Sequence, residues 1–180
     1  MASRRIVVAT ASRHGATAEI GERIARVLVD ETIRLGGSID VEVVDAGQPE
    51  AADDADAVIP GSAVYYGRWL PDARRFADHL VEDGSHRPVW LLSSGPVDRT
   101  GKDAATSRSS RWNQAAWARE HRTFGGKLDH SSLGRVERMV AGLIKAPDAD
   151  ARPFDEIEHW ARSIARQIHG DDDHHGESPP

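Results

Sequence analysis

The chain has 180 residues, no cysteine and a formal net charge of −6 at neutral pH. This length predicts one domain with a sizeable core, and the negative charge argues against a general nucleic-acid binder. Without cysteine the chain forms no disulfide, thiol redox centre or cysteine-ligated cluster, so electron chemistry would need a bound organic cofactor. The sequence has no apolar run long enough to cross a bilayer and no signal-peptide pattern, which predicts a cytoplasmic protein.

The first predicted elements are a strand and a long helix joined by a hydroxyl-rich loop. Arg5–Ala9 is a β-branched apolar run, typical of a strand buried on both faces. An amphipathic helix follows from about Ala16 to the stop at Gly36. Such a helix directs its unpaired backbone N–H groups at one spot, which predicts a phosphate site. The alternative interpretation is an ordinary turn with an N-cap at Ser12 or Thr17.

The type of phosphate ligand is narrowed by the motifs that are missing. The dinucleotide pattern Gly-x-Gly-x-x-Gly is absent. The segment Gly95–Lys102 resembles a nucleoside-triphosphate loop, but it has five residues between its glycines, and Asp103 stands where Ser or Thr is needed. What remains is a loop in which Ser12 and Thr17 offer hydroxyl donors and Gly15 allows close backbone approach.

The next segments predict two more strands. Ile39–Val44 alternates in hydrophobicity and predicts the second strand, and Gln48–Asp54 predicts a surface loop or short irregular helix. Ala55–Ala63 predicts the third strand. Proline cannot donate to a sheet, so Pro60 predicts that pairing ends near Ile59.

A turn, a helix and a fourth strand follow. Val64–Trp69 crowds aromatic and glycine residues into a turn, and Pro71 suits the first position of a helix that closes near Gly84. Arg87–Ser93 predicts a doubly buried strand, after which Ser94–Val97 turns away. The apolar face of the helix comprises Ala73, Phe76, Ala77, Leu80 and Val81.

The last third of the chain is less regular. Residues 98–119 form a polar excursion with one helix predicted at Ser109–Trp117, and Arg122–Phe124 predicts a fifth strand. Phe154–Ile168 has helical spacing, and the acidic tail 171–180 is expected to be disordered. Outside this tail no predicted element carries His, Asp or Glu with metal-ligand spacing, so no metal site is expected.

Alternating strands and helices predict a single α/β domain over residues 1–170. The expected architecture is a doubly wound, five-stranded parallel sheet with helices on both faces. Ligands of such sheets bind outside the carboxyl ends of the strands. Three loops of unusual composition fall at those ends, namely Thr10–Thr17, Gly61–Trp69 and Ser93–Val97.

The motifs of these loops resemble the flavodoxin family. More narrowly, the chain resembles the flavodoxin-domain branch that includes the menaquinone-dependent protoporphyrinogen oxidases, over about residues 4–168. The motifs that carry the resemblance are Ser12–Thr17, Gly61–Trp69, Ser93–Pro96, Phe124–Asp129 and Ile144–Pro147. One departure is Arg13-His14, where electron-transfer flavodoxins usually carry small hydroxyl residues; a cation there would strengthen phosphate binding.

The resemblance implies a flavodoxin-like fold and FMN as cofactor. It places the phosphate on Ser12, Arg13, His14, Gly15, Ala16 and Thr17. It places the isoalloxazine between two further segments, which comprise Ser62, Ala63, Val64, Tyr65, Tyr66 and Gly67 in one and Ser93, Ser94, Gly95 and Pro96 in the other. Tyr65 or Tyr66 is the expected stacking ring; the alternative is that both are half-buried loop residues.

A basic segment bears on the choice between enzyme and carrier. Residues 99–127 hold seven basic against two acidic residues, a local charge of +5. If this segment flanks the flavin, it would attract an anionic substrate such as a porphyrinogen; the alternative is a solvated surface. The amphipathic stretch Leu133–Lys145 packs on the sheet or, alternatively, contacts the inner face of a membrane and a quinone.

Three functions follow from these patterns. The first is an FMN oxidoreductase that passes electrons from a small-molecule, protoporphyrinogen-type substrate to a quinone. The second is an electron-transfer flavodoxin that relays electrons between redox protein partners. The third is a flavodoxin-like scaffold without cofactor. Asp98, His121 and His130 are candidate acids or bases, but the sequence assigns the role to none of them.

Overall fold

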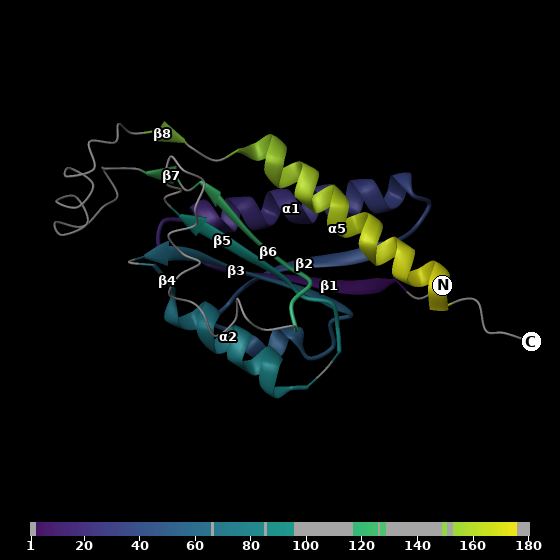
Figure 1. Ribbon diagram of the computed structural model, residues 1–180, viewed down its shortest axis with the longest axis horizontal. Helices are drawn as coiled ribbons and strands as arrows, with labels where there is room; N and C mark the ends of the chain where they lie inside the picture. The colour runs from purple at the N-terminus through teal and green to yellow at the C-terminus, as the bar shows by residue number, and fades with distance from the viewer. Residues whose placement is uncertain are drawn as a thin grey trace, which may run out of the picture.

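The computed structural model describes residues 3–65, 67–84, 86–95, 117–125, 127–128, 149–150 and 153–175. Five parallel strands lie in the order β2-β1-β3-β5-β6, and β4 pairs antiparallel with β3 (Figure 1). The strands are β1 (Arg4–Ala11), β2 (Ile39–Asp45), β3 (Ala57–Tyr65), β4 (Arg68–Trp69), β5 (Trp90–Gly95) and β6 (Glu120–Gly125). A separate antiparallel pair joins β7 (Lys127–Leu128) and β8 (Ala149–Asp150).

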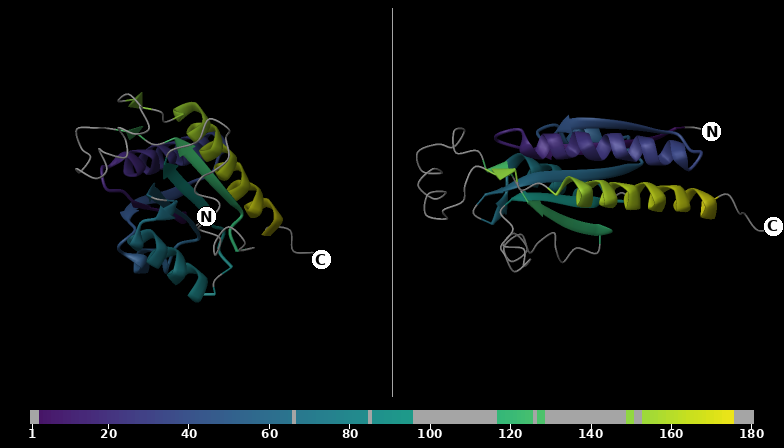
Figure 2. Two further views of the ribbon diagram at one scale, coloured as in Figure 1. Left: turned by 60° about the vertical axis from the view of Figure 1, so that its left-hand side comes forward. Right: turned by 90° about the horizontal axis from the view of Figure 1, so that it is seen from above.

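Helices cover both faces of the sheet. The helices are α1 (Ala16–Arg34), α2 (Pro71–Glu82) and α5 (Phe154–His175), with a 3-10 turn η1 (Pro49–Ala52). Figures 1 and 2 show α1 and α5 side by side on one face and α2 on the other. The doubly wound parallel sheet predicted from the sequence is therefore confirmed.

The core forms two layers because strand side chains alternate between the faces. Ile6 and Val8 of β1 pack in the layer under α1 and α5, whereas Val7 and Ala9 pack in the layer over α2. All four are fully buried. This double burial explains why β1 is a continuous apolar run rather than an alternating one.

The expected end of pairing near Ile59 is wrong. The β1–β3 ladder continues through Pro60 as far as Ser62. On the other side, Val58 forms an isolated bridge with Val89, just before β5, and β3 pairs with β5 from Gly61 onward. Proline has no N–H to donate, and Pro60 lies in the interval where β3 is not paired with β5. The missing donor therefore leaves the ladder to β1 intact.

Several element ends also differ from the sequence expectation. Ser94 and Gly95 are not a turn but the end of β5, because Ser94 pairs with both β3 and β6 and Gly95 pairs with β6. The segment Val64–Trp69 is a short hairpin rather than only a turn, since β3 runs on to Tyr65 and pairs with β4. Val81 is 47% exposed, because the buried stripe of α2 ends before it.

The last helix extends further than expected. α5 continues to His175, so residues 171–175 are helical where disorder was expected. Asp171 contributes to this extension through an ion pair with Arg119 at 2.8 Å. The predictions for Ser109–Trp117 and Leu133–Lys145 fall largely or wholly outside the described residues. In the described part of the chain, no helix is long and apolar enough to span a membrane.

Two ion-pair clusters join α1 to α5. Arg23 contacts Glu158 at 2.5 Å, and Glu31 contacts Arg166 at 2.9 Å. The partners are eight residues apart on each helix, about two turns, so the contacts repeat along two parallel helices. Each glutamate also pairs with an arginine of its own helix, which is Arg34 for Glu31 and Arg162 for Glu158.

These contacts lower the pKa of both glutamate carboxyl groups. Burial raises the pKa of Glu31, but hydrogen bonding to Arg166 and the charges of Arg34 and Arg166 outweigh it and leave the pKa lowered. The hydrogen bond from Arg23 lowers the pKa of Glu158 despite its desolvation. Both groups therefore stabilise the fold in their charged form.

We expect low pH to weaken the ion pairs between α1 and α5 and so to lower the stability of the protein. Because the folded-state pKa values are lowered, the stabilisation is present above the ordinary carboxyl pKa of about 4.3 and is lost as the pH falls through the folded-state values. Glu158→Gln should therefore be less stable than wild type at neutral pH, with a smaller loss of stability on acidification. Urea unfolding at about pH 7, 4 and 3 measures both effects.

The matched control is Glu22→Gln on α1. Glu22 is exposed, and its side chain forms no ion pair within the described residues. The control should follow the wild-type pH dependence. Equal pH dependence of Glu158→Gln and wild type would contradict the assignment.

Candidate cofactor site

The strand register brings the three predicted loops to one edge of the sheet. Ala11 at the end of β1 pairs with Ser62, which in turn pairs with Ser93 of β5. The neighbouring strands approach closely there, since a Cβ added to Gly95 would lie 3.0 Å from the Cβ of Val64. The loops meet at the carboxyl ends of the strands, beside the central pair β1 and β3. The strand order reverses at this pair, as expected for a ligand site in a doubly wound sheet.

The loop after β1 ends in a glycine cap. Gly15 is the N-cap of α1 with φ 80°, a left-handed conformation that favours glycine. The alternative cap at Ser12 or Thr17 is thereby excluded. Ser12 Oγ only accepts a long hydrogen bond of 3.4 Å from the Thr17 N–H. The first turn of α1 thus lacks a strong side-chain cap, which leaves its N–H groups available to an anion.

Thr17 carries an unpaired hydroxyl in this first turn. The residue is fully buried, and its Oγ1 has no hydrogen-bond partner within the described residues. A buried hydroxyl without a partner costs free energy, so such groups usually have a ligand or water beside them. This hydroxyl fits the donor set that a bound phosphate requires.

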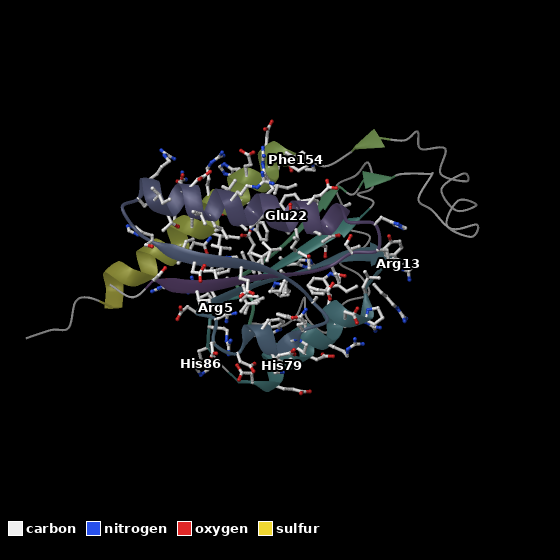
Figure 3. The ribbon with its side chains drawn as sticks, turned by 180° about the vertical axis from the view of Figure 1, so that it is seen from behind. Arg5, Arg13, Glu22, His79, His86 and Phe154 are labelled. Atoms are coloured by element: carbon white, nitrogen blue, oxygen red, sulfur yellow. The ribbon has the colours of Figure 1, made fainter. Side chains whose placement is uncertain are left out.

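Arg13 links the loop to the β3–β4 hairpin. Its guanidinium carbon lies 4.7 Å from the centre of the Tyr65 ring, a cation–π contact. Figure 3 shows Arg13 at the carboxyl ends of the strands, far along the sheet from Arg5 at the start of β1. Arg13 and His14 are exposed, whereas Tyr65 is partly buried. One face of the Tyr65 ring is therefore occupied by the guanidinium.

Ser62 uses its hydroxyl within the protein. The hydroxyl donates to the carbonyl of Ala63 at 2.8 Å and accepts the N–H of Leu70 at 2.9 Å. Leu70 is the N-cap of α2, so Ser62 fastens the start of that helix to β3. The side chain of Ser62 belongs to the frame of the site.

Ser93 also has internal partners. Its Oγ accepts the indole N–H of Trp69 at 2.8 Å and lies 2.8 Å from His121 Nε2. An indole nitrogen only donates, so Ser93 Oγ accepts from Trp69; toward His121 the hydroxyl donates or accepts according to the tautomer of the imidazole. The rings of Trp69 and His121 meet edge to face at 6.1 Å. This buried network ties β4, β5 and β6 together.

His121, one of the candidate acids or bases, is half-buried and has its Nε2 in contact with Ser93. Ser93 is fully buried, which excludes it as an accessible nucleophile. No local pattern indicates this network, because its members are 24 and 28 residues apart and belong to three strands. Only the sheet register brings them into contact.

Of the seven basic residues in the segment 99–127, the structure describes the side chains of two. Arg119 pairs with Asp171 at 2.8 Å, and Arg122 pairs with Glu120 at 2.6 Å. Both precede or occupy the amino-terminal half of β6, away from the carboxyl edge. The described arginines of this segment therefore do not flank the candidate site.

Several predicted site residues lie outside the described residues. They are Tyr66, Pro96, Asp98 and His130. In the part of the chain that the structure describes, no three His, Asp or Glu residues form a group that could hold a metal.

We expect Ser93→Ala to destabilise the protein. The substitution leaves the buried Trp69 indole N–H without an acceptor, which should cost about 1–3 kcal/mol in the free energy of unfolding. Ser94→Ala is the matched control: Ser94 is also buried, with no side-chain hydrogen bond among the described residues, so its substitution should cost less than about 1 kcal/mol. Urea unfolding decides, and equal losses in both variants would contradict a specific role of the network.

Comparisons with known proteins agree with this geometry. Oxidised flavodoxin 2 of Bacillus cereus is 19% identical, with a TM-score of 0.59 and coverage of 91% of this chain and 99% of its own. An oxidoreductase of Corynebacterium diphtheriae is 12% identical, with a TM-score of 0.61 and coverage of 91% and 96%. A Fusobacterium nucleatum flavodoxin variant bound to flavin mononucleotide is 16% identical, with a TM-score of 0.50 and coverage of 68% and 69%.

These similarities establish the flavodoxin-like fold. No curated protein matches the chain in sequence. The family model described as the flavodoxin domain matches residues 7–153, which is most of the chain. The chain therefore belongs to the flavodoxin domain family.

Proposed function

We propose that the protein binds FMN at the carboxyl edge of its sheet and acts as a flavin redox protein. The observation that carries the proposal is the start of α1, where the left-handed cap at Gly15 adjoins the unpaired buried hydroxyl of Thr17. Family membership supports the same cofactor. When bound, the flavin supplies the electron-transfer chemistry, and the protein supplies binding and orientation.

The residues of the edge divide between holding the ligand and building the frame. The loop from Ser12 to Thr17 would hold the phosphate, through backbone N–H groups and the two hydroxyls. The hairpin around Tyr65 and the end of β5 would flank the flavin ring. Because the hydroxyls of Ser62 and Ser93 are already bonded, these strands would offer backbone groups and apolar contacts to the ring.

The proposed activity is that of an oxidoreductase with a substrate of its own. A protoporphyrinogen-type substrate and a quinone acceptor rest on the sequence resemblance of the loops. The alternative is an electron-transfer flavodoxin that relays electrons between protein partners. Neither is favoured by Arg119 or Arg122, which are paired within the protein and away from the edge.

Titration with FMN tests the cofactor. The wild-type protein should quench flavin fluorescence and shift the flavin absorbance bands on binding. Ser12→Asp should weaken FMN binding at least about tenfold, because a carboxylate beside a phosphate is repelled by more than about 1 kcal/mol. Ser38→Asp adds the same charge at the exposed start of β2, at the other end of the sheet, and should bind FMN as wild type does. Absence of FMN binding by the wild type would overturn the proposal.

Reduction of the FMN-loaded protein separates enzyme from relay. An oxidoreductase of the proposed kind should lose flavin absorbance when protoporphyrinogen IX is added without oxygen, and regain it with a quinone. A relay should be reduced only by a reductase protein with its electron donor. Reduction by the reductase alone would contradict the substrate proposal while leaving the cofactor assignment in place.

A further inference from the structure

The contact between Arg13 and Tyr65 connects two of the loops at the candidate site. Arg13 belongs to the loop that precedes α1, and Tyr65 is the last residue of β3. The guanidinium carbon lies 4.7 Å from the ring centre, within the range of a cation–π interaction. The two segments are neighbours because Ala11 pairs with Ser62 in the central ladder.

This contact restrains the Arg13 side chain against the ring of Tyr65. An arginine side chain loses about 2 kcal/mol of rotamer entropy when it is fixed. If the side chain is mobile before the ligand binds, most of this entropy is lost on binding and weakens the affinity. A guanidinium that is already in place binds an anion more tightly. The Tyr65 ring holds the guanidinium between the phosphate loop and the hairpin before any ligand arrives.

Arg13 differs from the other charged side chains around the start of α1. Glu19 stands in the first turn and is exposed, and His14 is the other basic side chain of the loop. Arg68 lies on β4 opposite Tyr65 but forms no hydrogen bond or ion pair within the described residues. Arg13 is thus the permanent cation of the loop itself.

We propose that Arg13, positioned by the ring of Tyr65, makes the site select a flavin that carries a phosphate over riboflavin. The inference rests on the proposed function. A phosphate dianion gains from a nearby guanidinium, whereas the neutral hydroxyl that replaces it in riboflavin does not. Arg13 is the specificity-determining residue, and Tyr65 acts through it as a positioning residue.

The selectivity ratio, defined as the Kd of riboflavin divided by the Kd of FMN, tests the proposal. Arg13→Gln should lower the ratio about tenfold, mainly by weakening FMN binding. Arg68→Gln is the matched control, since it removes a cation from the same edge outside the loop; it should leave the ratio within about twofold. Fluorescence quenching measures both dissociation constants for each variant.

Substitutions of Tyr65 test the positioning role. Tyr65→Phe keeps the ring and should keep the ratio, whereas Tyr65→Leu should lower it about threefold because the cation loses its support. In the Arg13→Gln background, Tyr65→Leu should leave the ratio unchanged. FMN and riboflavin carry the same flavin ring, so any direct effect of the Tyr65 ring on that group changes both dissociation constants equally and cancels in the ratio.

The outcomes distinguish this inference from the proposed function. If the wild type binds FMN but Arg13→Gln leaves the ratio unchanged, or Arg68→Gln lowers it equally, the selectivity role is overturned alone. If Tyr65→Leu lowers the ratio equally with and without Arg13, the positioning role is overturned. A wild type that binds neither flavin overturns the proposed function and this inference together.

Discussion

The pairing of β1 with β3 is the constraint on which the candidate site depends. Both strands are central in the sheet, and their ladder runs unbroken from Ile6 to Ala11 on the β1 side. It fixes the loop before α1 beside the hairpin after β3, although about 50 residues separate them in the sequence. The contact of Arg13 with Tyr65 exists only because this ladder continues past Pro60.

The polar groups near the edge have two different physical roles. Ser62 and Ser93 are buried with complete sets of partners, so they hold α2, β4 and β6 in place at little free-energy cost. The hydroxyl of Thr17 is equally buried but has no partner in the described structure. Thr32, Trp117 and Thr123 also carry buried polar atoms without a partner among the described residues, so the position of Thr17 in the first turn of α1 is what links its hydroxyl to a ligand.

Helix α1 serves the site at one end and the fold along its length. Its first turn faces the edge, while Arg23 and Glu31 further along join it to α5 through ion pairs. α5 packs on the same face of the sheet, and the apolar layer that α1 shares with the strands and α5 sets the direction of α1. The direction of the helix in turn decides where its N-terminal N–H groups point.

The sequence by itself determined the fold class and the place of the candidate site. The apolar run of β1, the glycine before α1 and the order of strands and helices are local patterns, and each predicts one geometry. Tertiary structure decided the partners of each side chain. The extension of β3 through Pro60 and the Trp69–Ser93–His121 network depend on neighbouring strands, which no local pattern reveals. A sequence specifies backbone preferences over a few residues, whereas side-chain partners are set by register between strands that are distant along the chain.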